Sequence, residues 1–396
     1  MKYLMSEMFS LAKRFLSYNY LENDFFELKL RLLKELNSRN TYKIFESELN
    51  RIETSIKYFQ IRNSEYFYQM YKLKELASDF YSYKNRLSVK REHNKIIENI
   101  LSNFLISLLD SYYEITSDAT EFRLNIDLYL VSFIDDYVNQ NKNIINPVVI
   151  IYYNIFMLSY RKEQSYYIKL LELKREYLHI LDDHGKHRIF EALGNYCINR
   201  YQQGDINYYK DAFRLINDEI KSGVRFNRKE FSEIFFTNKV EIAAKLKEYN
   251  WAENFIRHYS DRLSPAQRED IINFSYSIIE FEKKNYTASM KYLSKINFDN
   301  PILKFRVRNY MLLNYFELNY YDSAYSLIDS YTHLLKKDDK VETSRKERYT
   351  IFLNFCQKLL GMKSGYKEIE KEILKKDIEK NSVFMKQWLL EKVDEL

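Results

Sequence analysis

One stretch of the chain, Leu246–Ser330, decides the fold, and it reads LKEYNWAENFIRHYSDRLSPAQREDIINFSYSIIEFEKKNYTASMKYLSKINFDNPILKFRVRNYMLLNYFELNYYDSAYSLIDS. Three aromatic residues in it, Trp251, Tyr286 and Tyr321, follow one another at intervals of 35 residues. A period of about 35 residues with two apolar helical stripes is typical of stacked helix-turn-helix repeats, in which each unit buries one face against the next. The spacing therefore predicts an all-α fold: an α-solenoid of antiparallel helix pairs, wound as a right-handed superhelix, with the three aromatic side chains largely buried in their own repeats.

Glycine and proline are scarce, with 6 and 3 among 396 residues. Tight β-hairpins need residues that accept a positive φ, so a chain this poor in glycine does not suit an all-β fold. The same scarcity leaves little material for a loop that cradles phosphate, and the sequence contains no G-x-G-x-x-G, Walker, H-E-x-x-H or G-x-S-x-G motif. We therefore expect neither an enzyme nor a cofactor.

Amphipathic helical patterns continue on both sides of the central stretch and divide the chain into two regions. Residues 1–143 form a less regular helical region, whereas 144–396 carries the repeats and ends in capping helices. Asn146-Pro147, Ser264-Pro265 and Asn300-Pro301 each pair a good N-cap residue with proline at the first helical position. We predict that a helix begins at each of the three prolines.

Two short runs carry a resemblance to a known repeat. Lys284-Asn285-Tyr286-Thr287-Ala288-Ser289 and Asn319-Tyr320-Tyr321-Asp322-Ser323-Ala324 resemble the turn and second-helix start of a tetratricopeptide repeat, where an aromatic residue precedes a small one by three. Pro301 stands where such repeats often end in proline. Lys284 and Asn319 occupy the place of the usual glycine, and the first-helix signature of tryptophan, leucine and glycine is absent. The resemblance makes the chain a divergent, tetratricopeptide-like protein.

A second resemblance covers more of the chain. The run from Asp299 to Ser330, together with Arg62-Asn63-Ser64-Glu65-Tyr66-Phe67-Tyr68, is similar to an uncharacterised family of helical proteins common in Bacteroidota. This resemblance implies a helical fold and no activity.

The charge pattern leaves two classes of partner open. The chain has 62 basic and 56 acidic residues, a net charge of +6, and both signs are interleaved. Such a mild excess is typical of a solvated surface and favours a scaffold that binds a peptide or a partner helix in a concave groove. The alternative is a basic helical-repeat protein that binds RNA or DNA through phosphate contacts. Its strongest support is a basic cluster that comprises Lys304, Arg306, Arg308, Lys336, Lys337, Arg345, Lys346 and Arg348.

A row of polar residues marks one candidate for the partner-binding groove. Asn238, Asn273 and Arg308 stand 35 residues apart, thirteen before the repeated aromatic residues, and Lys304 lies one helical turn from Arg308. Amides and a guanidinium supply donors for peptide carbonyls or a carboxylate. The other interpretation is a solvated stripe on the outer face, because polar periodicity alone does not separate the two faces of a solenoid.

The remaining features indicate a cytoplasmic protein without metal or membrane contact. Cys197 and Cys356 stand alone on apolar helical faces, as buried free thiols do. The N-terminus shows no signal peptide, and the uncharged run 143–160 is divided by Pro147 and too short to span a bilayer. Asp182-Asp183-His184-Gly185-Lys186-His187 could offer metal ligands, but the favoured interpretation is an interhelical turn with an N-capping acid.

Overall fold

A computed structural model describes residues 2–57, 61–82, 86–122, 128–141, 144–202, 205, 207–224, 230–296, 301–338, 341, 343–366, 369–381 and 383–396. These residues form 19 α-helices and two 3₁₀ turns and contain no β-strand. Each helix packs mainly against its neighbours in the sequence. The all-α, solenoid-like fold predicted from the repeat spacing is therefore confirmed. No helix in the described part of the chain is both long enough and apolar enough to cross a membrane.

The chain forms two compact units, which are described separately. Unit 1 comprises residues 1–114 and 128–186, and unit 2 comprises 115–127 and 187–396. The boundary expected at 143/144 falls inside unit 1. Arg161 Nη2 lies 2.6 Å from Asp135 Oδ2, and the Tyr153 hydroxyl donates a hydrogen bond to the same carboxylate. Because Asp135 precedes the expected boundary and its two partners follow it, these bonds join the two sides.

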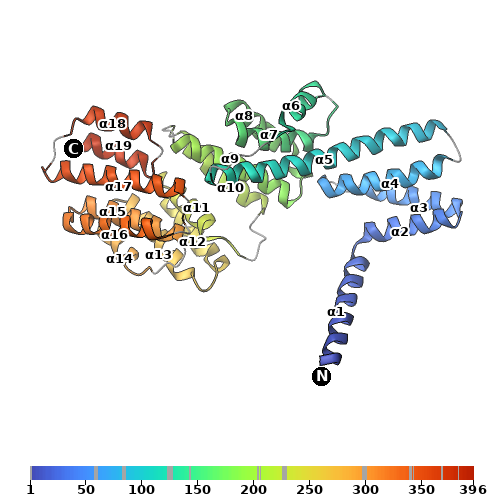
Figure 1. The fold of residues 1–396 in the computed structure, drawn as a ribbon, viewed down its shortest axis with the longest axis horizontal. Coiled ribbons are helices and arrows are strands. Elements are labelled where there is room, and N and C mark those ends of the chain that lie inside the picture. The colour runs from blue at the N-terminus through green and yellow to red at the C-terminus, as the bar shows by residue number, and fades with distance from the viewer. Residues whose placement is uncertain are drawn as a thin grey trace. The chain divides into compact units, whose positions relative to one another are not determined.

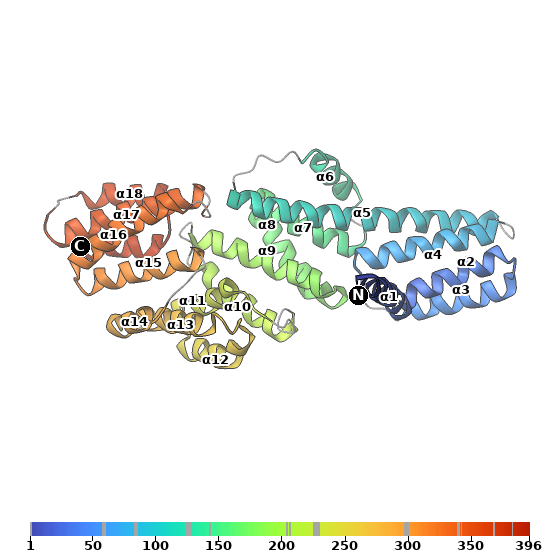
Figure 2. The same ribbon diagram turned by 60° about the horizontal axis from the view of Figure 1, so that its bottom comes forward.

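Unit 1 contains the first eight helices and one 3₁₀ turn. Their bounds are α1 (Lys2–Asn23), α2 (Phe25–Ser38), α3 (Tyr42–Lys57), α4 (Ser64–Ser82), α5 (Arg86–Phe122), α6 (Val131–Gln140), α7 (Pro147–Arg161), α8 (Gln164–Tyr177) and η1 (Leu178–Ile180), with the end of α5 assigned to unit 2. Helices α2, α3 and α4 lie side by side (Figures 1 and 2). Leu33, Phe45, Leu49 and Leu73 are fully buried in the small core of this layer.

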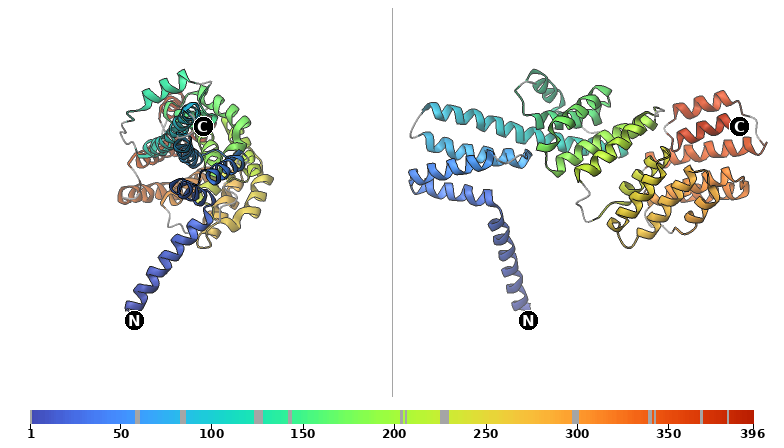
Figure 3. Two further views of the ribbon diagram at one scale, coloured as in Figure 1. Left: turned by 90° about the vertical axis from the view of Figure 1, so that its right-hand side faces the viewer. Right: turned by 180° about the vertical axis from the view of Figure 1, so that it is seen from behind.

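Helix α1 differs from the other helices of unit 1 because its apolar side chains face solvent. None of the described side chains of α1 contributes to the packed core of α2–α4. Figures 1 and 3 show α1 leaving the layer formed by α2 and α3. The large apolar side chains of α1 that are more than 60% exposed are Met5, Met8, Phe9, Leu11, Phe15, Leu16 and Tyr18.

Unit 2 contains the remaining helices, except for residues 183–186 at the start of α9, which belong to unit 1. Their bounds are α9 (Asp183–Gln202), α10 (Asn207–Ser222), α11 (Glu233–Lys245), α12 (Tyr249–Tyr259), η2 (Ser260–Arg262), α13 (Arg268–Glu282), α14 (Tyr286–Leu293), α15 (Pro301–Glu317), α16 (Tyr321–Lys337), α17 (Thr343–Lys363), α18 (Lys371–Lys380) and α19 (Lys386–Glu395). One continuous core runs from Phe231 to Val393. Helices α17, α18 and α19 lie side by side at its end (Figures 1 and 3).

The same turn joins the two helices of successive pairs in unit 2. Lys247, Lys284, Asn319 and Gly365 have φ values of 63°, 63°, 61° and 75°. In each turn the next N–H bonds the carbonyl five residues back, as in Asn285 N to Glu280 O at 2.8 Å and Tyr320 N to Tyr315 O at 2.9 Å. This pattern is a Schellman-type helix end, which satisfies carbonyls of the first helix and needs one left-handed residue. Lys284 and Asn319 thus adopt the left-handed conformation that glycine usually takes at this position.

These turns fix the register of the repeat and correct part of the sequence interpretation. The left-handed residues Lys247, Lys284 and Asn319 are spaced by 37 and then 35 residues. Helices α12, α14 and α16 begin two residues later, at Tyr249, Tyr286 and Tyr321. The structural equivalent of Tyr286 and Tyr321 is therefore Tyr249, and the assignment of Trp251 to this series was wrong.

The expected burial of the three aromatic residues also needs correction. Trp251, Tyr286 and Tyr321 are only partly buried at the edge of the core. Trp251 packs against α10, the second helix of the previous pair, where its Nε1 donates to Asn217 Oδ1 at 3.0 Å. The fully buried position is the small residue three further along from each helix start, occupied by Ala252, Ser289 and Ala324.

The three proline positions give two helix starts and one error. Helix α7 begins at Pro147, and Asn146 Oδ1 accepts a hydrogen bond from Val148 N at 3.0 Å, as predicted. Helix α15 begins at Pro301, while Asn300 lies outside the described residues. Helix α13 begins at Arg268 and not at Pro265, because residues 264–267 close a separate turn through the bond from Gln267 N to Ser264 O.

Candidate functional site

Unit 2 encloses a cavity of about 1240 Å³. The first helices of the pairs, α11, α13, α15 and α17, supply about half of its wall. The rest comes from α9, α10, α14, α18, α19 and the residues just before α19. The cavity therefore lies on the face lined by the first helices of the pairs, which is where a helical-repeat solenoid presents its inner wall. Acidic, basic and aromatic side chains line it.

A buried ion network centres on Glu241 of α11. Arg306 Nη2 lies 2.6 Å from Glu241 Oε2, and Lys245 Nζ lies 3.3 Å from Oε1. Arg306 also donates to Thr237 Oγ1 at 2.8 Å. Burial alone raises the pKa of Glu241, but Lys245 and Arg306 outweigh it and the pKa is lowered overall. Glu241 is therefore an ionised carboxylate that is already paired, with one cationic partner from its own helix and one from α15.

A second carboxylate, Glu282 at the end of α13, has no such partner. It forms no hydrogen bond or ion pair with the side chains that the structure describes, although it is partly buried in the cavity wall. Burial raises its pKa to about 6; Glu241 and Glu391 add to this rise, and Lys245 opposes it. An unpaired carboxylate in such a place loses hydration without compensation.

Tyrosine hydroxyls form the adjoining part of the wall. Tyr310 is only 1% exposed, yet its hydroxyl has no hydrogen-bond partner among the described residues. Tyr201 and Tyr209 also line the cavity, with their ring centroids 3.7 Å apart, and Lys245 Nζ lies 5.6 and 5.7 Å from the two rings. Since buried polar groups are nearly always hydrogen-bonded, the orphan hydroxyl of Tyr310 marks a position where a partner is missing.

The far wall of the cavity is fixed by the C-terminal helix α19. Lys392 Nζ lies 2.8 Å from Glu317 Oε1, and Trp388 Nε1 donates to the same oxygen at 3.0 Å. Phe384 stacks on Tyr349 at a centroid distance of 4.3 Å, and Arg348 lies over its ring at 4.3 Å. These contacts hold α19 against α15 and the preceding residue Phe384 against α17, and Lys392 and Glu317 form a charge pair in this wall.

Three charged wall residues occupy equivalent positions in successive pairs. Lys245, Glu282 and Glu317 each stand two residues before the left-handed turn residue of their pair, at spacings of 37 and 35. All three line the cavity. This row was missed from the sequence, although charged residues at the end of otherwise apolar helices were its visible signal.

The expected row of Asn238, Asn273, Lys304 and Arg308 is only partly at the cavity. Asn238 lines it, whereas the other three do not. Asn273 is buried at 7% exposure, and Arg308 is half-buried with Nη1 3.4 Å from the Lys304 carbonyl. Their role in partner binding stays a prediction.

The register explains why these residues do not form one row. Asn273 and Arg308 stand eleven residues before their turn residues, Lys284 and Asn319, but Asn238 stands nine before Lys247. The true equivalent in α11 is Phe236, which is fully buried. The position of Asn273 and Arg308 therefore belongs to the side of the first helix that packs into the core.

Part of the basic cluster considered for nucleic acid is engaged within the protein. Arg306 is paired with Glu241, and Arg348 lies over Phe384. Burial lowers the pKa of Arg308 and Arg348. Lys336 and Lys337 face solvent. Phosphate binding needs clustered cations that reach the backbone of the nucleic acid, and the engaged arginines are not available for such contacts.

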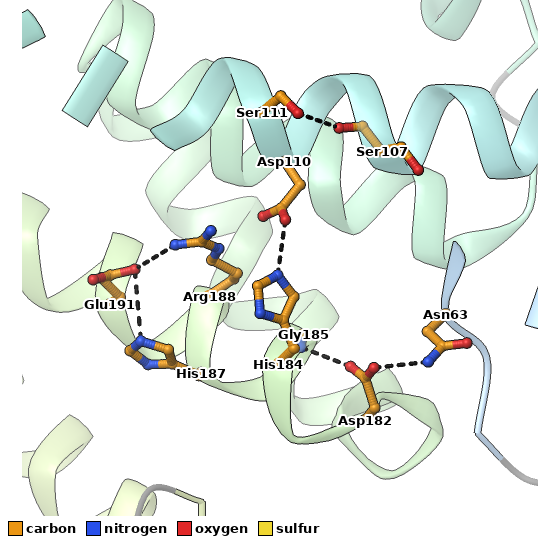
Figure 4. Close-up of polar contacts among 10 residues, drawn as sticks. All are labelled: Asn63, Ser107, Asp110, Ser111, Asp182, His184, Gly185, His187, Arg188 and Glu191. Atoms are coloured by element: carbon orange, nitrogen blue, oxygen red, sulfur yellow. Dashed lines mark hydrogen bonds and ion pairs between the residues drawn. The ribbon is translucent and has the colours of Figure 1, made fainter. Parts of the chain in front are cut away.

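The acidic and imidazole residues between η1 and α9 form a structural turn (Figure 4). Asp182 Oδ1 accepts from Gly185 N at 2.8 Å, and its Oδ2 accepts from Asn63 Nδ2 at 2.8 Å. His184 Nε2 lies 2.8 Å from Asp110 Oδ2. The interpretation of Asp182 as an N-capping acid is confirmed. In the part of the chain that the structure covers, no group of three or more His, Cys, Asp or Glu residues could hold a metal ion.

Unit 2 begins just after this turn, and its first residues make their own contacts. His187 Nε2 and Arg188 Nη1 lie 3.9 and 3.2 Å from Glu191 Oε2 (Figure 4). Cys197 and Cys356 are buried, as expected. Burial raises the pKa of the Cys356 thiol well above its usual value, so this residue is a poor nucleophile at neutral pH.

Comparison with known protein families, with curated proteins and with solved structures finds no match to this chain. The functional argument therefore rests on the cavity of unit 2 and on the residues that line it.

Proposed function

We propose that the protein is a non-enzymatic, tetratricopeptide-like scaffold of the cytoplasm that holds a peptide segment or a partner helix in the cavity of unit 2. The repeated Schellman-type turns and the small buried residues Ala252, Ser289 and Ala324 support the tetratricopeptide-like assignment, because they place aromatic and small residues where the resemblance expects them. The right-handed superhelix stays a prediction of the same proposal.

The size of the cavity favours an extended ligand. Its volume of about 1240 Å³ exceeds the roughly 300–1,000 Å³ of typical small-molecule sites. The aromatic wall residues Tyr201, Tyr209, Tyr286 and Trp388 offer apolar area together with polar tips. Such residues are enriched where proteins bind protein segments, because they combine large contact area with hydrogen bonding.

The observation that carries the proposal is that charges of both signs are interleaved in the wall. Five glutamates line the cavity, Glu241, Glu282, Glu317, Glu379 and Glu391, together with seven basic residues, Lys245, Lys284, Arg306, Arg345, Arg348, Lys386 and Lys392. The glutamates oppose a continuous run of phosphates in RNA or DNA, whereas a peptide brings charges of both signs and neutral backbone groups that match such a wall. A peptide or helix is therefore favoured over nucleic acid as the occupant of this cavity.

A pull-down with an occluded cavity tests this proposal. Asn238→Trp adds bulk at the wall, and Ser330→Trp makes a similar change at an exposed position of α16 outside the wall. We expect nuclease-treated lysate to yield a protein partner with wild type and Ser330→Trp but not with Asn238→Trp. Retention that survives high salt agrees with a peptide, whereas nucleic-acid binding falls steeply as salt rises. Equal capture by all three proteins, or capture of nucleic acid alone, would contradict the proposal.

Arg308→Glu separates the two candidate rows. If the row predicted from the sequence binds the partner, this reversal of charge weakens capture. If the wall row of Lys245, Glu282 and Glu317 binds it, Arg308→Glu leaves capture within about twofold, because Arg308 does not line the cavity and its charge acts on the ligand only over a longer, screened distance. A titration of the captured partner by calorimetry measures the difference.

A further inference from the structure

We propose that the cavity recognises a basic side chain, lysine or arginine, of the bound peptide, and that this cation is received by the Glu282 carboxylate and the Tyr310 hydroxyl. The inference rests on the proposed function and names the chemistry of the ligand. It follows from which wall groups already have partners and which do not.

Glu282 is the one partly buried carboxylate of the described wall that remains uncommitted. Glu241 is paired with Arg306 and Lys245, and Glu317 with Lys392 and Trp388. The other two wall glutamates, Glu379 and Glu391, are exposed to solvent and keep their hydration. Only Glu282 is therefore removed from much of its water without receiving a cation or a donor in exchange.

Tyr310 supplies an independent indication of a missing polar partner. Its ring is fixed between Phe274 and Phe281, with centroids 5.7 and 5.4 Å away. Tyr310 lines the cavity, and its buried hydroxyl has no hydrogen-bond partner among the described residues. Tyr310 lies on α15 and Glu282 on α13, two helices in direct contact. A phenol oxygen accepts an N–H donor, so an ammonium or guanidinium held by Glu282 would also satisfy the hydroxyl.

The surrounding charges favour a cation over an anion. The groups that act on Glu282 are Lys245 and Glu241 of α11 and Glu391 of α19, and Arg306 of α15 neutralises Glu241. Counting these with Glu282 gives two positive and three negative charges, a sum of −1. An incoming carboxylate or phosphate would meet Glu282 and Glu391, whereas a basic side chain brings the sum to zero.

The decisive experiment is a selection from a library of short random peptides embedded in a constant loop, so that no free peptide amine is offered. Wild type, Glu282→Gln and Glu269→Gln are immobilised in parallel. Glu269 is an exposed carboxylate on the same helix and does not line the cavity, so its variant is the matched control. Circular dichroism verifies that all three remain folded.

We expect wild type and Glu269→Gln to enrich peptides with a lysine or arginine at one fixed position. Glu282→Gln should lose this enrichment and bind the selected peptides at least about tenfold more weakly, as expected when one member of a desolvated charge pair is removed. Because Glu282 titrates near pH 6, wild type should also bind them about tenfold more weakly near pH 5 than near pH 7.5. The Glu282→Gln variant should not show this pH dependence.

Two outcomes overturn the inference and are distinguishable. If no protein enriches any peptide, the proposed function fails and the inference fails with it. If peptides are enriched without a basic position, or Glu282→Gln enriches the same peptides with the same affinity, the cavity binds peptides but not through a cation at Glu282. In that case the proposed function stands and the inference is rejected.

Discussion

The two units differ in the kind of side chain that lacks a partner, which is apolar in unit 1 and polar in unit 2. Unit 1 exposes a stripe of apolar side chains on α1, including Phe9 and Phe15 at 64% and 67% exposure, while α2–α4 keep a small core of their own. Unit 2 has one continuous apolar core from Phe231 to Val393 and holds unpaired polar groups, Glu282 and Tyr310, in the wall of a cavity. Regular stacking of helix pairs therefore buries apolar area efficiently. The inner wall that this stacking creates is where polar groups remain available for a ligand.

The largest expected effect tests this contrast directly. Phe274 is fully buried in unit 2, where its ring packs against Tyr310 and Arg306, whereas Phe9 of α1 faces solvent. Phe274→Ala should lower the free energy of unfolding by about 3–5 kcal/mol through lost burial and a cavity. Phe9→Ala should change it by less than about 0.5 kcal/mol. Urea denaturation followed by circular dichroism measures both, and similar losses in the two variants would refute the contrast.

The next effect concerns the unpaired carboxylate of unit 2. Glu282 has a folded pKa of about 6 against a model value of 4.5, so the native state binds the proton more tightly. The stability that this proton gives is fully present below about pH 4.5 and is lost as the pH rises through 6, by up to about 2 kcal/mol.

The neutral variant Glu282→Gln removes this dependence. It should match wild type near pH 4 and exceed its stability by about 1–2 kcal/mol near pH 7. Denaturation curves at the two pH values provide the measurement, with Glu269→Gln as the control that follows wild type. A variant less stable than wild type at pH 7 would show that Glu282 has a stabilising partner in the protein.

A smaller effect tests the repeated turn of unit 2. Lys284 adopts φ of 63°, a region that glycine enters without the clash of a Cβ atom. Lys284→Gly should therefore stabilise the protein by up to about 1 kcal/mol, partly offset by the greater freedom of glycine in the unfolded chain. Gly365, with φ of 75° and open space around its Cβ position, provides the reverse test. Gly365→Ala should cost about 1 kcal/mol. Thermal denaturation measures both variants, and a less stable Lys284→Gly together with a more stable Gly365→Ala would contradict the assignment of the turns.

The sequence predicted the helices better than their register. Asn146-Pro147 marks the start of α7 because the cap and the proline act locally, within one helical turn. The register failed at Trp251 because the connection between α12 and α13 contains η2 and a further turn, which lengthen that repeat to 37 residues. Counting aromatic residues selected Trp251, two residues after the true equivalent Tyr249.

The candidate site was less predictable than the fold for a physical reason. Whether a charged residue at the end of a helix meets water or a cavity wall depends on how successive pairs stack, which no local pattern encodes. Nothing in the sequence therefore separates Glu282 from a surface carboxylate or Tyr310 from a core aromatic residue. The left-handed turn residues supply part of the missing information, because counting back from Lys247, Lys284 and Asn319 aligns Lys245, Glu282 and Glu317.

The smallest effect on stability sharpens the description of unit 1. A chain that starts at Asp24 lacks α1 but keeps the cap of α2, since Asp24 Oδ1 accepts from Glu27 N at 3.0 Å. No described side chain of α1 enters the core of α2–α4. The midpoint of thermal unfolding should therefore shift by no more than a stability change of about 0.5 kcal/mol would cause. Self-association at high concentration should decrease, because large exposed apolar patches promote it. Sedimentation velocity and calorimetry on both chains provide the readouts. A marked loss of stability would show that α1 is an integral part of the unit 1 core, and the contrast between the two units would then be wrong.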